Sequence, residues 1–393
     1  MAINKEQNKL NVPHLRFPEF HGEWEKCKLG DIAEFSTARV SSVKLDCKNY
    51  VSTENMLQDF QGVVEAKSVP IETNVISFTC GDILISNIRP YLKKVWKATF
   101  DGGCSSDVFV LQATDTVAKD YLHYAVANDK FINYVMSGAK GVKMPRGDKN
   151  QMRTYQLSLP SIQEQYKIAK LLTLLDERIA TQSKLIEDLK KLKSAIIDYA
   201  INSLDSGFVK FGSLYEMAGE GGTPTTSNVS FYDNGKIPFI KIDDLKKKYL
   251  TENKDFITEL GLQKSSAWLV PTRSILFSNG ATIGEITITT YPVCTKQGIL
   301  GIVPKPNVDV EFLYYFMSSS YFKKAVSRIV TEGTMKTVYL KDINNIRCPI
   351  PIKGKQQDIA KMPSALNSKI DFEQSILKLF CSQKQYLLRQ MFM

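Results

Sequence analysis

Polar and basic residues follow two matched strand-like runs of the sequence, and their types suit contacts with a nucleic acid. The first run leads into residues 86–94 and the second into residues 278–282. Asparagine and arginine side chains can form paired hydrogen bonds with purine edges, while serine, threonine and lysine suit phosphate groups. For any one of these residues, a polar turn is the simpler interpretation.

Three further segments carry side chains of the same kinds. Residues 141–146 correspond to 332–336 in the repeat described below, and both contain lysine. Residues 221–225 could present backbone N–H groups to a phosphate, although a plain glycine turn is commoner, and residues 296–297 have no obvious packing role. The candidate DNA-contact residues are Ser86, Asn87, Arg89, Lys93, Lys94, Lys143, Arg146, Gly222, Thr223, Ser278, Asn279, Lys296, Gln297, Thr334 and Lys336.

The sequence gives little support for catalysis or for a metal site. It lacks the glycine motifs of nucleotide-binding loops, the nucleophile elbow of hydrolases and the histidine motif of zinc proteases. Seven cysteines are scattered without a C-x-x-C pair, and only three histidines could join them as ligands. We therefore predict no catalytic residue and no metal, and a nuclease or modifying centre without a sequence signature stays an alternative.

Composition describes a folded, basic protein. The net charge is +10 and the isoelectric point is about 9.0, which suits a polyanionic partner, although a solvated lysine-rich surface is also common. No stretch approaches the ~20 apolar residues that a membrane span needs, and residues 1–5 lack an apolar signal core. We expect a cytoplasmic location and no membrane association.

A repeat with a constant offset of 191 residues organises the chain. Pro351 corresponds to Pro160, and Ile370 corresponds to Ile179. The match extends upstream through residues 121–131, where aromatic and apolar residues recur at the same offset. The chain therefore reads as one globular-plus-helix unit written twice.

Each copy ends in a long helical segment with the spacing of a coiled coil. Residues 162–204 contain neither Pro nor Gly, and apolar residues recur in steps of four and three. Adding 191 to each position gives the same seam near the C-terminus, where Pro363 predicts a later start or a kink. The predicted seam residues are Ile168, Leu172, Leu175, Ile179, Ile186, Leu189, Ile196, Ile359, Leu366, Ile370, Leu377, Phe380 and Leu387.

These two helices are expected to pack against each other. Roughly 43 residues at ~1.5 Å each would make a helix of about 65 Å, which cannot bury its apolar stripe alone. We predict antiparallel pairing within the chain, so that the helices would act as a ruler between the globular segments. A long amphipathic helix can also serve as a dimerisation device, and this alternative stays open.

The globular segments, residues 24–158 and 209–349, show an α+β pattern of short strand-like runs, turns and short helices. They open alike, but residues 27–34 precede residues 209–216 by only 182 positions. The second segment therefore carries about ten extra residues, which we place within 217–262. The two halves share a frame and differ in its loops.

The connectors that introduce the two helices, residues 159–165 and 350–357, complete a recognisable organisation. Together with residues 24–32, and with Gly-Gly-Thr-Pro at 221–224, they make the chain resemble the specificity subunit of type I restriction-modification systems over essentially its full length. The second connector departs from the family pattern at Lys353-Gly354-Lys355.

The resemblance implies an α+β fold with two tandem, pseudo-repeated α/β globular target-recognition domains, separated and joined by two long antiparallel coiled-coil helices. The first domain would span residues 1–158 and the first spacer helix 159–205. The second domain would span residues 206–349 and the second spacer helix 350–393.

The resemblance further implies a role in host defence. Each domain would read one half of an asymmetric, bipartite site on double-stranded DNA, and the helices would set the spacer and dock two methyltransferase subunits. S-adenosylmethionine, ATP and Mg²⁺ would belong to the methyltransferase and restriction subunits, and this chain would bind no cofactor. A coiled-coil scaffold or adaptor without sequence-specific DNA binding is the alternative.

Overall fold

The computed structural model describes residues 11–280, 282–330 and 336–392. Its internal contacts divide the chain into unit 1, Met1–Thr181 with Leu377–Met393, and unit 2, Gln182–Ile376. Because the division falls within the two long helices, the four-part division expected from the sequence stays a prediction. The two units are described separately below.

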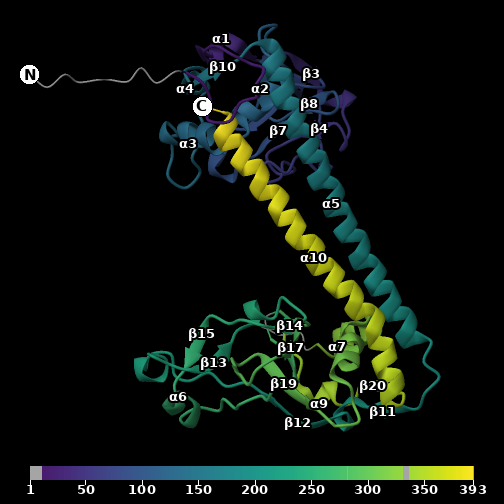
Figure 1. Ribbon diagram of the computed structural model, residues 1–393. Helices are drawn as coiled ribbons and strands as arrows, with labels where there is room; N and C mark the ends of the chain where they lie inside the picture. Colours follow the sequence, from purple (N-terminus) through teal and green to yellow (C-terminus); the bar gives the residue numbers. More distant parts are fainter. Residues whose placement is uncertain (1–10, 281, 331–335, 393) are drawn as a thin grey trace, which may run out of the picture. The chain divides into compact units, whose positions relative to one another are not determined.

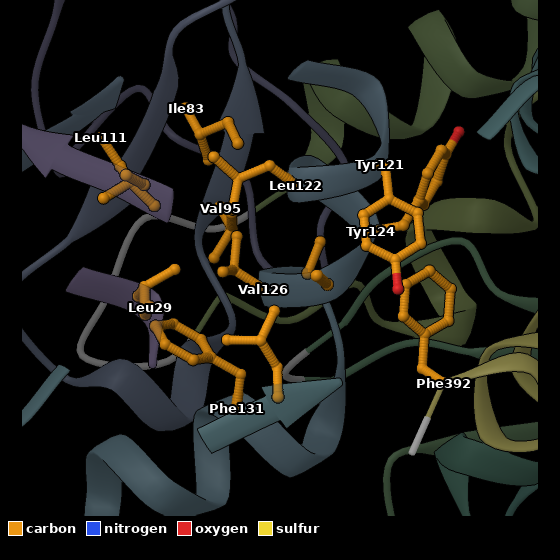
Figure 2. Close-up of a cluster of buried hydrophobic side chains, with 14 of the residues drawn as sticks. Leu29, Ile83, Val95, Leu111, Tyr121, Leu122, Tyr124, Val126, Phe131 and Phe392 are labelled. Carbon is orange, nitrogen blue, oxygen red and sulfur yellow. The ribbon is translucent and has the colours of Figure 1, made fainter. Parts of the chain in front are cut away.

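Unit 1 is built around a four-stranded antiparallel sheet whose central strands are apolar on both faces. The strand order is β2 (Ala33–Phe35), β9 (Val108–Ala113), β6 (Ile83–Ser86) and β7 (Val95–Lys97). Helices α2 (Lys119–Val126) and α3 (Asp129–Ser137) contribute Leu122, Val126 and Phe131 to the core that the sheet shares (Figure 2). Two-sided burial explains why these strands are continuous apolar runs rather than alternating ones.

A second, smaller sheet of unit 1 has its own core. Its order is β3 (Arg39–Ser41), β5 (Asn74–Phe78), β8 (Gly102–Cys104) and β4 (Tyr50–Val51), with β4 parallel to β8. At Gly102 an added Cβ would lie 2.1 Å from the Asn49 carbonyl oxygen. Only glycine therefore allows β8 to lie this close to the backbone of Asn49. Phe78 and Trp96 pack edge to face between this sheet and the main one.

A short antiparallel ribbon closes unit 1 and leads into the first long helix. It pairs β1 (Glu25–Lys28) with β10 (Gln156–Leu159). Helices α1 (Leu29–Ile32) and α4 (Lys149–Arg153) pack together beside it, and the 3₁₀ turns η1 (Ser42–Lys44) and η2 (Pro90–Leu92) lie in the loops.

Unit 2 repeats the main sheet of unit 1 strand for strand. The order is β12 (Tyr215–Glu220), β19 (Ile299–Pro304), β16 (Ile275–Ser278) and β17 (Ile286–Thr289), extended by β14 (Tyr249–Leu250). The helices also recur, as α7 (Val310–Ser318), α8 (Ser320–Ile329) and α9 (Leu340–Ile343), and the closing ribbon pairs β11 (Phe208–Lys210) with β20 (Arg347–Pro349).

The second sheet of unit 2 departs from its counterpart. It has the order β15 (Asp255–Ile257), β13 (Ile237–Ile240) and β18 (Cys294–Thr295), with α6 (Glu259–Gln263) following β15. The 3₁₀ turns η3 (Phe211–Ser213), η4 (Val229–Phe231) and η5 (Ile242–Asp244) complete the unit. Strands β13 and β15 lie within residues 217–262, the stretch in which the sequence places the extra residues.

The two long helices are α5 (Ile162–Asn202) and α10 (Lys353–Met391), drawn in teal and yellow in Figure 1. Within unit 1, Lys384 Nζ lies 2.6 Å from Asp176 Oδ1, and within unit 2, Lys193 Nζ donates to Asn367 Oδ1 at 2.9 Å. A later residue of α5 thus contacts an earlier residue of α10, so the helices are antiparallel, as predicted. None of the described helices combines the length and the apolar character that crossing a membrane would need.

Several predicted seam residues pack into the globular cores. Ile168, Leu172, Leu175 and Leu387 belong to the core of unit 1, with Ile179 and Phe380 beside it, and Ile359 packs against the core of unit 2. Near the end of α5, however, Ile197 and Ile201 are 4% and 3% exposed, whereas the predicted Ile196 is half-buried. An α-helix turns every 3.6 residues rather than every 3.5, so the buried stripe moves away from the strict repeat. The buried seam residues are Ile168, Leu172, Leu175, Ile186, Ile370 and Leu387. The half-buried ones are Ile179, Leu189, Ile196, Ile359, Leu366, Leu377 and Phe380.

The expectation that Pro363 delays the start of the second helix is wrong. Helix α10 begins at Lys353, ten residues earlier, and is continuous through Pro363. Proline removes one backbone hydrogen bond from a helix interior. The Pro363 ring is buried, so its packing helps to offset that loss.

A buried glutamine anchors the first turn of each long helix in the same way. Gln165 Oε1 accepts from the Ala118 backbone N–H at 2.8 Å, and its Nε2 donates to the Pro160 carbonyl at 3.0 Å. Gln356 repeats both bonds, with the Asp309 N–H at 2.7 Å and the Pro351 carbonyl at 2.8 Å. Each partner in the second copy follows its counterpart by 191 residues. Both glutamines are 1% exposed, so the repeat extends to individual buried hydrogen bonds.

A polar pair interrupts the apolar seam in unit 2. Gln182 Nε2 donates to the Glu373 backbone carbonyl at 3.1 Å and also to its side-chain carboxylate. Glu373 is only 5% exposed, and its carboxylate also forms an ion pair with Lys369. A single polar pair in a coiled-coil seam costs stability but favours one register.

Candidate nucleic-acid interface

In unit 1, two loops that the sequence marks separately lie side by side. The Arg89 backbone N–H donates to the Pro145 carbonyl at 2.8 Å, and the Gly147 N–H donates to the Asn87 carbonyl at 3.0 Å. Arg89 has a left-handed backbone with φ of 50°, which turns the chain at this point. Residues 86–94 and 140–147 therefore form one surface, carried by the end of β6.

Four candidate contact residues are buried, and three of them, Ser86, Ser278 and Asn279, carry polar side chains. Ser86, Ser278 and Asn279 are 2%, 0% and 1% exposed. Ser86 Oγ donates to the Ile88 carbonyl at 3.0 Å, and Asn279 Nδ2 donates to the Val338 carbonyl at 3.1 Å. These side chains hold the loops from inside, so their positions indicate support for a contact surface rather than direct contact with a ligand.

Carboxylates neutralise two of the candidate cations in the unit 1 loops. Lys93 Nζ lies 2.8 Å from Asp129 Oδ1, and Arg146 NH1 donates to Asp107 Oδ1 at 2.9 Å. Such partly exposed pairs contribute little to stability, but they reduce the positive potential that a polyanion meets.

The remaining cations of this surface differ in exposure. Lys94 Nζ donates to the Thr53 carbonyl at 2.6 Å. Burial, and then the neighbouring Arg89 guanidinium, lowers the pKa of Lys94 from its ordinary value. Lys143 and Arg89 are exposed at the loop tips. They are the unit 1 candidates best placed to reach a phosphate.

Unit 2 repeats this loop pairing. The Asn279 N–H donates to the Gly298 carbonyl at 3.0 Å, and the Val338 N–H donates to the Asn279 carbonyl at 2.9 Å. The exposed Lys336 lies two residues before Val338, so it is held beside the end of β16. Thr334 lies outside the described residues.

A third predicted group is also assembled in unit 2. The Gln297 N–H donates to Thr223 Oγ1 at 3.2 Å, which brings residues 223 and 296–297 together with both Lys296 and Gln297 exposed. Gly222 is buried, and an added Cβ would lie 2.3 Å from the Ala267 nitrogen. Close packing therefore explains this glycine, and its N–H is not placed for an exposed phosphate.

Sequence reasoning missed three exposed cations on α8, which are Lys323, Lys324 and Arg328. The 191-residue offset aligns them with Ile132, Asn133 and Ser137 in unit 1, so the repeat held the signal that these positions are charged in the second copy only. The anchoring glutamines of α5 and α10 were visible in the same alignment.

The groups gathered on these surfaces are of the kinds that bind a nucleic acid. Within the parts of the chain that the structure describes, no group of three or more His, Cys, Asp or Glu side chains could hold a metal ion. The surfaces instead provide lysine and arginine charges, amide groups and backbone N–H groups at loop tips, which are the groups that contact DNA phosphates and base edges.

Comparison with known proteins agrees with this description. The family model of the type I restriction modification DNA specificity domain matches the chain twice, over residues 21–191 and 204–379. The chain is 24% identical to the type I restriction enzyme MjaVIII specificity subunit of Methanocaldococcus jannaschii, over 95% of this chain and 92% of that protein.

Solved structures share the fold. The crystal structure of a type I restriction-modification system S subunit from M. genitalium aligns with a TM-score of 0.59 at 15% identity, covering 97% of this chain and 99% of that one. A chain from a structure of the assembly of the type I R-M system aligns with a TM-score of 0.58 at 17% identity, covering 93% and 96%.

Proposed function

The chain belongs to the type I restriction modification DNA specificity family, and from this premise we propose that its two units divide the reading of one DNA site. Each unit binds one half of a bipartite sequence. The paired helices set the number of unread base pairs between the halves. The observation that carries the proposal is the duplication itself, because the same main sheet and the same glutamine anchor recur in both copies.

Duplication of the frame with different loops suits two different half-sites. The main sheets agree in strand order, whereas the second sheets and the loop tips differ. Exposed lysine and arginine supply sequence-independent affinity that falls with salt, and loop side chains discriminate bases by about 1–3 kcal/mol per good contact. The candidate residues named above supply both kinds of group.

The methyltransferase partner docks on an exposed apolar line of α5. Leu185, Leu192 and Tyr199 are spaced by seven residues and are 41%, 48% and 77% exposed. Apolar residues at one heptad position, left uncovered beside an occupied seam, are suited to a further protein surface. S-adenosylmethionine, ATP and Mg²⁺ belong to the partner subunits, which perform methylation and cleavage.

The docking line can be tested with one matched pair of variants. Leu192→Glu should weaken association with the methyltransferase subunit at least tenfold, because a charge would be buried in the contact. Ser194→Glu adds the same charge at an exposed position off the line, and should leave association unchanged. Equal loss in both variants would point to a charge effect and against this docking surface.

Co-expression with a methyltransferase subunit tests the function as a whole. Modified adenines are mapped on host DNA by single-molecule sequencing. We expect methylation confined to a split motif with a fixed gap. A stable complex that leaves no new methylation would favour the scaffold alternative.

A further inference from the structure

A hollow of about 380 Å³ opens in unit 2 between α8 and the loop that joins β16 to β17. Phe277, Phe322 and Val326 contribute apolar side chains to its floor. Lys323, Ser327 and Lys336 contribute polar and positively charged groups to its rim. The hollow thus combines an apolar surface with two cations.

Among the described residues, no carboxylate compensates the charge of the hollow. None of the described residues that line it is acidic. Within the described residues, neither Lys323 nor Lys336 lies within ion-pair distance of a carboxylate. In the corresponding loops of unit 1, Asp129 and Asp107 neutralise Lys93 and Arg146.

The same place in unit 1 is built differently. The 191-residue offset aligns the three rim residues with Ile132, Met136 and Pro145, none of which is charged. Ile132 and Pro145 are buried, and η2 packs against α3 where the loop of unit 2 leaves α8 open. The basic rim is therefore a property of the second copy alone.

We propose that this hollow receives one sugar–phosphate step of the DNA backbone. The deoxyribose lies against the apolar floor, and the flanking phosphates contact Lys323 and Lys336. This assignment rests on the proposed function, because it deepens how unit 2 holds its DNA. Charge complementarity selects DNA over an apolar protein segment, since two uncompensated lysines would face such a segment without a partner.

Salt dependence of binding provides the test. The full chain, in complex with methyltransferase subunits, is titrated with one duplex that carries its site and another that lacks it, over a series of KCl concentrations. Each phosphate contact contributes about 0.9 to the slope of log K against log salt. Lys323→Gln and Lys336→Gln should each lower the slope by about 0.9, equally on both duplexes.

Lys324→Gln is the matched control. Lys324 is the neighbouring residue on α8 and is exposed, but it does not line the hollow. Its removal should leave the slope unchanged. The double variant of Lys323 and Lys336 should lose the sum of the two single effects, about 1.8.

Three results would overturn the assignment. Wild-type slopes in both single variants would show that no phosphate is bound there. Weakening that depends on one particular base would indicate a base contact instead. Loss of methyltransferase association with an unchanged slope would identify a protein occupant. Failure of the proposed function would give a different result, because the wild-type complex would then bind both duplexes equally well. The salt slope on the duplex without the site would still test whether the hollow binds phosphate.

Discussion

Units 1 and 2 agree where their side chains are buried and differ where they meet solvent. Both contain the four-strand order of the main sheet, and both close on a long helix through a glutamine that is 1% exposed. Their second sheets pair differently, with β5 beside β8 in one unit and β15 beside β13 in the other. Buried hydrogen bonds and packing therefore preserve a frame on which recognition surfaces can change independently.

The two copies also differ in how their cations are compensated. The loops of unit 1 pair one lysine and one arginine with aspartate, whereas the described residues that line the hollow of unit 2 include two lysines and no carboxylate. A shared fold thus supports two different electrostatic surfaces.

Phe392 should stabilise unit 1 more than any other residue of the chain's end. Its ring stacks on Tyr121 with centroids 5.1 Å apart, and it is 7% exposed. Phe392→Ala should cost about 3 kcal/mol because it leaves a cavity. The counterpart at the 191-residue offset is Ile201, so Ile201→Ala should destabilise unit 2 similarly. Hydrogen exchange, followed peptide by peptide, separates the two units.

Tyr386→Ala is a control for these substitutions, because Tyr386 is 58% exposed and its removal should change stability by less than about 0.5 kcal/mol. A loss of protection spread evenly over both units after Phe392→Ala would contradict the assignment of this residue to unit 1.

The glutamine anchors should have equal energetic value in the two copies. Gln165→Leu and Gln356→Leu should each cost about 2 kcal/mol, because each leaves a buried N–H and a buried carbonyl without their partner. Denaturant unfolding measures the loss. Gln357→Leu, at an exposed neighbouring position, should be nearly neutral. A large effect in one copy only would break the equivalence of the two joints.

Acid should destabilise unit 1 before unit 2 through His123. Burial, followed by the nearby Lys384 charge, lowers the pKa of His123 from 6.5 to about 4. Between these pH values the unfolded chain is protonated at His123 and the folded unit is not. The stability of unit 1 is therefore lost as pH falls from about 6.5 towards 4. Allowing for the partial exposure of the ring, the loss is about 1–2 kcal/mol.

Tyr314 occupies the equivalent position in unit 2, and burial raises its pKa above the ordinary tyrosine value. His123→Phe should therefore flatten the pH dependence of unit 1 and leave unit 2 unchanged. Stability measured at intervals between pH 4 and 7 would show a persistent slope if another group in unit 1 is responsible.

The smallest effect concerns the polar contacts between the long helices. Asp176 forms an ion pair with Lys384 in unit 1, whereas Asn367 occupies the equivalent place in unit 2. Asp176→Asn should make the first contact resemble the second and cost about 0.5 kcal/mol at low salt. The difference should vanish at high salt. A salt-independent loss would mean that packing of Asp176, rather than its charge, matters.

The sequence predicts the repeat, the antiparallel helices and the family, because each depends on buried apolar residues at regular spacing. It does not predict the second sheets, whose strands are short and pair across long loops. Ser278 and Asn279 illustrate the same limit for the interface. Their residue types suit DNA contact, but they are buried and bonded to the backbone of their own unit.

Small geometric effects account for other differences. The buried stripe of α5 reaches Ile197 and Ile201 because the helix has 3.6 residues per turn, and a strict seven-residue pattern cannot anticipate that shift. Pro363 remains inside α10 because tertiary packing outweighs one lost hydrogen bond. Lys323 stands out only when the two copies are aligned.

The polar pair in the seam joins equivalent positions of the two copies. Gln182 and Glu373 are the same position of the two copies, 191 residues apart, and they face each other. In a symmetric assembly of two identical half-length chains, this position would meet itself. Two glutamines could share hydrogen bonds there, but two buried glutamates would repel. A glutamate is thus suited to only one of the two facing positions, so the two halves of the chain are not interchangeable at this point of the seam.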